Sequence, residues 1–182
     1  MKNVAAFQVA LLVLGGALAA QASAADTLLP PAIPGYGVVT PVENAGERPD
    51  PAMDYKIVMN ATKGGTDDTP PIFLDKAAKV MNLLAQSGVP ADHRHVVVIL
   101  QAAATTAVLN DKGLKARGLA RNPSAELIEK LNGAGVSVRV CGQALAQAKI
   151  ARDEVRPGVQ VDLSAFTTVG GLQLRGYALL VD

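Results

Sequence analysis

Tryptophan is absent from this 182-residue sequence, and three phenylalanines and three tyrosines are its only aromatic residues. Proteins that bind single-stranded nucleic acids stack the bases on aromatic side chains, and no such platform is evident here. An excess of basic charge is also missing, because the formal net charge at pH 7 is +1. A nucleic-acid partner requires a basic face that neutralises phosphates. The two absences together argue against nucleic acid as a partner.

Cysteine is nearly absent as well, because Cys141 is the only one in the chain. A single cysteine forms no disulfide within the chain, so the fold must depend on packing alone. A lone thiol in an oxidising compartment must be buried, paired between chains or kept reactive. Burial is the ordinary state of a free cysteine. The composition leaves these alternatives open.

Residues 1–25 have the pattern of a secretory signal peptide. Lys2 supplies a positive start, residues 9–20 are apolar, and Ala22-Ser23-Ala24 matches a signal-peptidase site. The apolar run is shorter than the roughly 20 residues that a membrane-spanning helix needs. We predict a periplasmic or secreted protein with no membrane attachment after cleavage, the alternative being an uncleaved anchor.

Residues 26–54 differ in composition from the rest of the chain, since six of the eleven prolines lie here among several glycines. Proline lacks a backbone donor and restricts φ, so this density excludes a helix or an inner strand. We predict an extended arm or linker, either disordered or packed along a neighbouring subunit.

From residue 55 to residue 182, short apolar runs alternate with segments of helical periodicity. Continuous apolar runs such as His95 to Leu100 are typical of parallel strands that are covered on both faces. This alternation predicts an α/β fold, one compact domain with a mainly parallel sheet of about five strands between helices. The alternative is a mixed α+β layer. The strands are expected at 55–60, 95–100, 136–141, 159–161 and 177–181. Helices are expected at 70–87, with Asp68 or Thr69 as the cap, and at 102–110, 122–133 and 143–151. A last helix should follow a cap at Asp162 or Ser164, and residues 111–121 should form a surface loop or a frayed helix.

Cys141 ends one of the predicted strands, where the next helix begins. A helix N-terminus carries about half an elementary positive charge, which favours the reactive thiolate. Open α/β sheets also bind their ligands at the carboxyl ends of their strands. Gly142 would let another molecule approach closely, and Gln143 has a side-chain amide for a hydrogen bond beside the sulfur. Cys141 is therefore the catalytic candidate, with Gly142 and Gln143 as binding candidates.

Two further binding candidates are expected at the same sheet edge. Gln101 ends the second predicted strand, and Lys63 lies in the loop after the first. Lys63, Arg139 and Arg152 are the candidate cationic neighbours of the thiol. Arg139 shares a strand face with Cys141 by alternation, and its alternative role is an ion pair at the sheet edge.

Other motifs do not support a cofactor or a metal. The run Lys63-Gly64-Gly65-Thr66 lacks the glycine spacing of a phosphate-binding loop, so no nucleotide is predicted. His93 and His95 could chelate a metal, but they have no further histidine or cysteine beside them and lie at the opposite end of the sheet from the thiol.

The sequence from about residue 55 to residue 180 resembles the DsrE/DsrF-like family, in its exported branch. The most specific piece is GVSVRVCGQ at 135–143, supported by residues 109–111, 122–123 and 174–178. The resemblance implies a compact α/β fold, homo-oligomers such as trimers or hexamers, and a strand-end cysteine that carries sulfur as a persulfide. Cys141 matches that cysteine. Many relatives have a His-Gly pair where this chain has Gln101-Ala102, so a base or ligand of the family is missing here.

The leading hypothesis is an exported sulfur carrier that takes sulfur from a donor protein and passes it to an acceptor through Cys141. The alternative is a non-catalytic oligomeric module that binds a small ligand or a metal in the same pocket. A third hypothesis is structural, with Cys141 buried or bridging two subunits.

Overall fold

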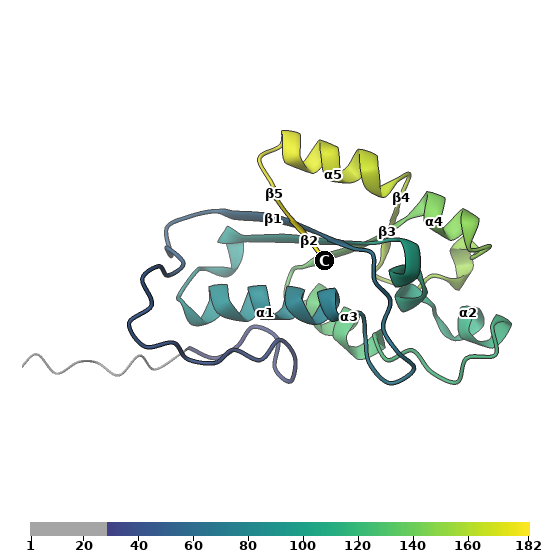
Figure 1. Cartoon of the computed structure of the whole chain (residues 1–182), viewed down its shortest axis with the longest axis horizontal. Helices are drawn as coiled ribbons and strands as arrows, with labels where there is room; N and C mark the ends of the chain where they lie inside the picture. Colours follow the sequence, from purple (N-terminus) through teal and green to yellow (C-terminus); the bar gives the residue numbers. More distant parts are fainter. Residues whose placement is uncertain (1–28) are drawn as a thin grey trace, which may run out of the picture.

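The computed structural model describes residues 29–182, so the predicted signal peptide at residues 1–25 lies outside the described residues. Five strands form one all-parallel sheet in the order β4-β3-β2-β1-β5 (Figure 1). This architecture confirms the predicted α/β domain with a parallel sheet of about five strands. The strands are β1 Tyr55–Ala61, β2 Arg94–Leu100, β3 Ser137–Cys141, β4 Gln160–Asp162 and β5 Ala178–Val181.

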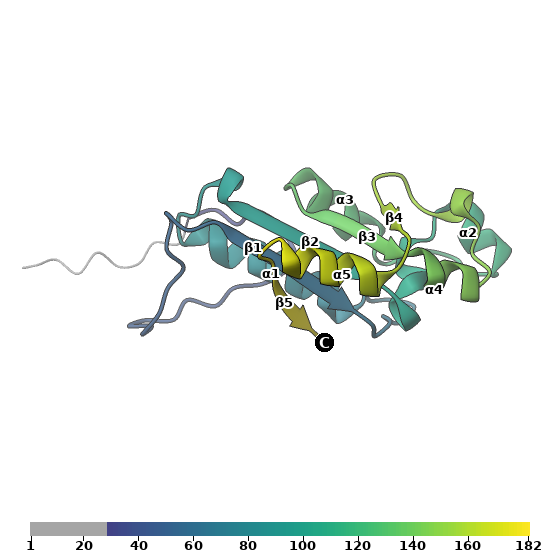
Figure 2. The same cartoon turned by 90° about the horizontal axis from the view of Figure 1, so that it is seen from above.

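Helices cover both faces of the sheet. In the two views, α1 and α3 lie along one face and α5 crosses the other (Figures 1 and 2). Within residues 29–182, no helix is long and apolar enough to cross a membrane. The α-helices are α1 Ile72–Gln86, α2 Asp111–Ala116, α3 Ala125–Gly133, α4 Gly142–Gln147 and α5 Ala165–Leu174, and the 3₁₀ helices are η1 Ala91–His93, η2 Ala102–Val108 and η3 Arg152–Glu154.

Strand β2 shows why the sheet separates two apolar cores. Val96, Val98 and Leu100 belong to the larger core under α1 and α3. Val97 and Ile99 point the other way and belong to a smaller core under α5. All five side chains are buried, because both neighbours of this central strand and both helical layers exclude water from it. The continuous apolar run in the sequence is the consequence of this double coverage.

Several helix boundaries differ from the predicted ones. The segment 102–110 forms a 3₁₀ helix over 102–108, and Asn110 instead caps α2, its Oδ1 accepting a hydrogen bond from Gly113 N at 3.0 Å. Helix α1 begins at Ile72 after Pro71, not after a cap at Asp68 or Thr69. Helix α4 ends at Gln147, and Lys149 follows with a φ of 52°, a left-handed conformation that stops a helix. Ser164 caps α5 as predicted.

The proline-rich arm packs on its own chain, which neither of the two predicted arrangements anticipated. Ile33 is fully buried against the core beneath α1 and α3. The buried side chain of Asn82 on α1 accepts a hydrogen bond from Ile33 N at 2.7 Å. The same amide donates to the carbonyl oxygens of Ile33, Tyr36 and Gly37 at 3.3, 2.8 and 3.1 Å. One asparagine thereby replaces the backbone partners that a regular strand would give the arm.

A second set of contacts holds the arm to α3. Tyr36 Oη donates to Glu126 Oε2 at 3.2 Å, and Lys130 Nζ lies 5.1 Å from the centre of the Tyr36 ring. Lys130 also pairs with Glu126 at 2.8 Å. The hydrogen bond and charge of Lys130, followed by the hydrogen bond from Tyr36, hold the pKa of Glu126 below its ordinary value. Glu126 is exposed and its two partners are half-buried, so these contacts orient the arm more than they stabilise it.

Candidate functional site

Cys141 is the last residue of β3, and α4 begins at Gly142, as the sequence predicted. Its side chain points toward the face covered by α5, in the smaller core with Val58, Ile99 and Ala165. Only 3% of the residue is exposed. The thiol therefore lies at the ligand-binding edge of the sheet but beneath a layer of the chain itself.

The polar partner of the sulfur comes from α5. Ala165 N lies 3.3 Å from Cys141 Sγ and donates a hydrogen bond to it. Ala165 is the first residue of α5, and the register of β3 and β4 places Cys141 beside Asp162, just before that helix. The first N–H groups of a helix have no partner within the helix and favour negative charge nearby. The sequence pointed to α4 for this role, and the structure adds the longer helix α5.

Gly142 is enclosed by the turn between β4 and α5. A Cβ atom on Gly142 would lie 2.7 Å from the carbonyl oxygen of Asp162 and 3.3 Å from that of Leu163. The missing side chain thus gives room to the backbone of the same chain, whereas the sequence predicted room for another molecule. Gln143, the next residue of α4, is exposed.

A pair of amides lies near the thiol on the same face of the sheet. Gln101 Nε2 donates to Asn60 Oδ1 at 2.8 Å. Gln101 follows β2 and continues its register, since Gln101 N donates to Ala61 O at 3.0 Å. Alternation along the strands puts Asn60, Gln101 and Cys141 on the α5 side. The sequence pattern indicated Gln101 but not Asn60, whose only signal is that it is a polar residue near the end of an apolar strand.

Lys63 is exposed in the loop after β1, and its backbone N–H donates to Asp182 Oδ2 at 2.9 Å. Arg139 pairs with Asp162, Nη1 to Oδ2 at 3.5 Å, and Thr168 Oγ1 donates to the same oxygen at 2.9 Å. This is the ion pair at the sheet edge that was the alternative role of Arg139. Arg152 is exposed on η3.

The histidines lie near the amino ends of the strands, where they face one carboxylate. Asp54 Oδ1 is 4.0 Å from His93 Nδ1 and 3.7 Å from His95 Nε2. Over residues 29–182, no group of three or more histidine, cysteine, aspartate or glutamate residues is arranged to hold a metal ion.

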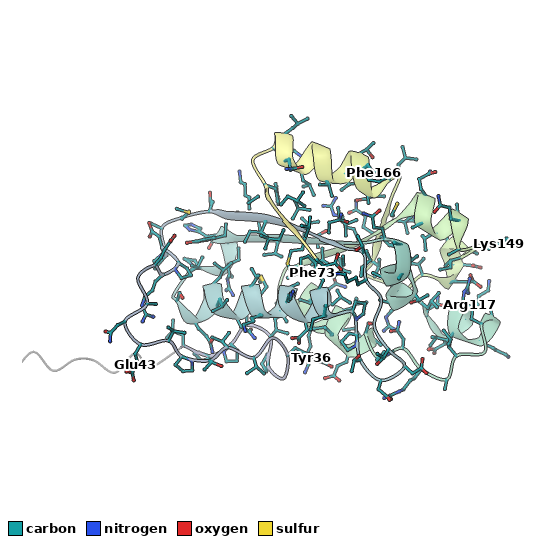
Figure 3. The ribbon with its side chains drawn as sticks, in the orientation of Figure 1. Tyr36, Glu43, Phe73, Arg117, Lys149 and Phe166 are labelled. Atoms are coloured by element: carbon teal, nitrogen blue, oxygen red, sulfur yellow. The ribbon has the colours of Figure 1, made fainter. Side chains whose placement is uncertain are left out.

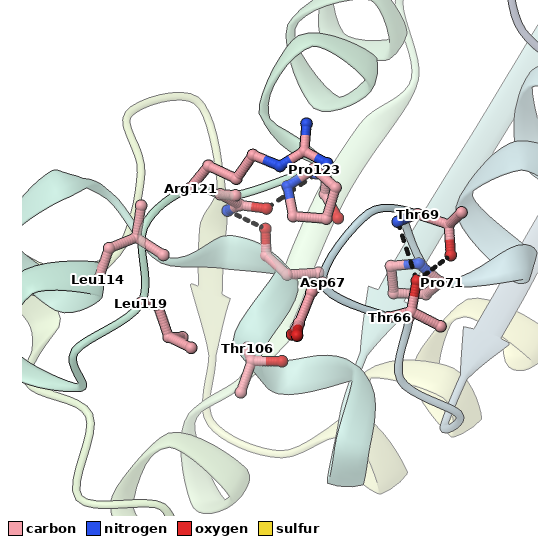
Figure 4. Close-up of a pocket in the computed structure, with 13 residues that line it drawn as sticks. Thr66, Asp67, Thr69, Pro71, Thr106, Leu114, Leu119, Arg121 and Pro123 are labelled. Carbon is pink, nitrogen blue, oxygen red and sulfur yellow. Dashed lines mark hydrogen bonds between the residues drawn. The ribbon is translucent and has the colours of Figure 1, made fainter.

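A separate hollow of about 220 Å³ opens on the other side of the sheet (Figure 4). It lies between the loop after β1, η2 and the segment before α3, and its lining includes Asp67, Thr106 and Arg121. Ala107 and Leu114, which also line it, belong to the core under α1 and α3. None of the five predicted site residues is among its lining residues. The structure thus brings Cys141, Gly142 and Gln101 to one edge without placing them in this hollow.

The sequence from residue 53 to residue 181 matches the model of the DsrE/DsrF-like family. The chain belongs to the DsrE/DsrF-like family. The match starts near the end of the proline-rich arm, so nearly all of the arm precedes the part that this DsrE-like protein shares with its family.

Two solved structures resemble this DsrE-like protein in fold. MTH1491, a protein of unknown function from Methanobacterium thermoautotrophicum, is 19% identical with a TM-score of 0.55, over 71% of this chain and all of the other. The ychN protein from E. coli is 19% identical with a TM-score of 0.52, over 70% of this chain and 99% of the other. No curated protein matches the sequence.

Proposed function

We propose that this DsrE-like protein is an exported sulfur carrier that holds sulfane sulfur as a persulfide on Cys141. The observation that carries the proposal is the hydrogen bond from Ala165 N to Cys141 Sγ at the start of α5. A helix N-terminus stabilises an anion on the neighbouring atom, whether that anion is the thiolate or the terminal sulfur of a persulfide. Membership in the DsrE/DsrF-like family and the pattern of residues 1–25 support the sulfur chemistry and the export respectively.

The transfer takes place in two exchange steps. The Cys141 thiolate attacks the outer sulfur of a donor persulfide, R–S–SH. A new S–S bond forms on Cys141, the donor's S–S bond breaks, and its electron pair leaves with the donor as a thiolate. An acceptor thiolate then attacks the outer sulfur of the Cys141 persulfide, which returns Cys141 to a thiolate. No external oxidant or reductant is needed, because each S–S bond that forms replaces one that breaks.

The chain segment that covers the Cys141 sulfur must move before a donor can reach it. Cys141 is 3% exposed, and the segment that covers it is the turn leading into α5. A donor reaches the sulfur when this turn moves outward, so we expect slow transfer to small donors. Closure then shields the persulfide from thiols in solution.

Intact-protein mass spectrometry tests the proposal directly. The freshly reduced chain without residues 1–25, treated with a polysulfide under native conditions, should gain the mass of one sulfur atom, and cyanide should remove it. Cys141→Ser should gain nothing while keeping the circular dichroism spectrum of the wild type, since serine has nearly the same shape as cysteine.

A thiol that gains sulfur only after denaturation would contradict the carrier function. The burial of Cys141 in an apolar cluster would then favour the second candidate, a non-catalytic module whose Cys141 forms the wall of a binding site. Metal analysis and ligand screening of the native protein would follow, because they separate that module from a purely structural role.

We further propose that this protein assembles into homo-oligomers, a trimer or a hexamer, through α5. Helix α5 contains no charged residue, and its outer surface carries Phe166 and Leu174, which are 81% and 92% exposed. Phe166 lies on the opposite side of the molecule from Tyr36 and the arm (Figure 3). Large apolar side chains that are exposed together on a helix without charge are typical of a surface that a protein partner covers.

Light scattering checks this assembly. The wild type should have the mass of a trimer or hexamer, and Phe166→Asp should shift it toward the monomer. Val42→Asp is the matched control, because Val42 is also an exposed apolar residue but lies on the arm. A wild type that stays monomeric at high protein concentration would overturn the proposal.

A further inference from the structure

The loop after β1 holds an anion that belongs to the chain itself. This loop begins at Thr62, which is followed by Lys63-Gly64-Gly65-Thr66, the motif that lacks the spacing of a phosphate-binding loop. Three donors converge here on the carboxylate of Asp182. Thr62 Oγ1 donates to Oδ1 at 2.7 Å, and the backbone nitrogens of Thr62 and Lys63 donate to Oδ2 at 3.1 and 2.9 Å. We refer to these three donors of Thr62 and Lys63 as the nest.

The electrostatics of the nest favour negative charge. Burial by itself raises the pKa of Asp182, and the hydrogen bonds from Thr62 and Lys63 together with the charge of Lys63 outweigh it, so that the pKa falls below its ordinary value. Successive backbone N–H groups that point to one spot are a common way to bind an anion. Here a hydroxyl and a nearby ammonium group add to them.

The backbone around the nest is fixed by close packing. A Cβ atom on Gly65 would lie 2.1 Å from Thr69 O, and one on Gly64 would lie 3.0 Å from Ala103 O. Only glycine allows the loop to fold back on itself and to lie against η2 at these distances. The two backbone donors lie directly before this fixed segment, and Thr62 O is itself held by a hydrogen bond from Ala104 N at 3.2 Å.

Asp182, whose carboxylate fills the nest, is held less firmly by its surroundings than the nest itself. Asp182 directly follows β5, an edge strand of four residues whose partner in the sheet is β1. Leu180 and Val181 are 40% and 66% exposed, so little buried area resists the release of this end of the strand.

We propose that the nest is an oxyanion site in which Asp182 takes the place of a ligand. A small carboxylate or a tetrahedral sulfur or phosphorus oxyanion would bind there with two oxygens when Asp182 leaves. The site lies at the carboxyl edge of the sheet, where α/β proteins bind ligands, and about 10 Å from Cys141 across two strand spacings. It does not depend on the chemistry of Cys141, so either proposal can fail without the other.

Nuclear magnetic resonance of the chain without residues 1–25 tests the site, with acetate, sulfate and thiosulfate as separate probes. In Asp182→Ala, we expect the amide signals of Thr62 and Lys63 to shift saturably. The apparent affinity should be at least about tenfold tighter than in the wild type, where the tethered carboxylate competes at high effective concentration. Comparison of the three probes shows whether a carboxylate or a tetrahedral anion is preferred.

Two matched variants complete the experiment. Adding Thr62→Val to Asp182→Ala should weaken binding, because the hydroxyl donor is lost, whereas Asp92→Ala, at an exposed acid on η1, should leave the wild-type behaviour unchanged. A bound anion should also raise the Tm of Asp182→Ala more than that of the wild type. If Asp182→Ala does not fold, Asp182→Asn keeps the side-chain shape without the charge and takes its place. Amide signals that stay unmoved by all three probes in the folded variant would overturn the proposal. Asp182 would then only hold the end of β5 against the loop after β1.

Discussion

Gly142→Ala is expected to lower the free energy of unfolding by about 1–3 kcal/mol and to accelerate the alkylation of Cys141. The added Cβ atom would lie 2.7 Å from the carbonyl oxygen of Asp162, and both groups are backbone or attached to it. The conflict can be relieved only if the turn from β4 to α5 moves away from β3. The turn leads into Ala165, whose N–H donates a hydrogen bond to the Cys141 sulfur, so this movement uncovers Cys141.

Urea unfolding and the rate of iodoacetamide modification measure the two effects. Gly170→Ala is the control, because a Cβ atom there would meet nothing within 4 Å and alanine favours the helix by up to about 1 kcal/mol. If Gly142→Ala were as stable as the wild type and its thiol as slow to react, the turn before α5 would not be the cover of Cys141.

Asn82→Ala should lower the free energy of unfolding by about 3–5 kcal/mol while leaving the sheet untouched. Asn82 makes one hydrogen bond to Ile33 N and three to carbonyl oxygens of the arm, in a setting where Ile33 is completely buried. Truncation leaves these backbone groups without partners away from water. It also removes the two hydrogen bonds that hold the backbone of Ile33 while its side chain packs in the core.

Denaturant unfolding gives the size of this loss, and hydrogen exchange at Ile33 and Gly37 locates it. Asn132→Ala provides the comparison, since Asn132 is also an asparagine on a helix but makes one exposed hydrogen bond, to Gly158 O at 3.2 Å. We expect that variant to lose less than about 1 kcal/mol. Equal stabilities of the two variants would show that the arm is not anchored through Asn82.

The sequence predicted most of what depends on local pattern. The run from His95 to Leu100 indicated a strand covered on both faces, and Cys141 was expected at the end of a strand with a helix after it, which the structure confirms. Both depend on properties of neighbouring residues in the chain. The length of α4 was overestimated, because Lys149 is not a residue type that ordinarily marks a left-handed position.

What the sequence did not predict are contacts between residues far apart in the chain. Ala165 follows Cys141 by 24 residues, and its contribution is a backbone N–H, which every non-proline residue has. Asp182 meets Thr62 across 120 positions of sequence. Proline density in the arm excluded regular structure correctly, but it gave no sign that Ile33 would enter the core, because single apolar residues are also common in loops.

The position of the proline-rich arm determines on which face of the sheet a tag or linker joined to it would lie. Ile33 and Tyr36 are fastened to α1 and α3, on the face of the sheet opposite α5 and Cys141 (Figure 1). A tether joined to this part of the arm is therefore anchored on the face of the sheet opposite α5. An affinity tag or a surface linker joined to the arm would leave α5, and the turn that covers Cys141, facing the solution, where a sulfur donor or a partner could reach them.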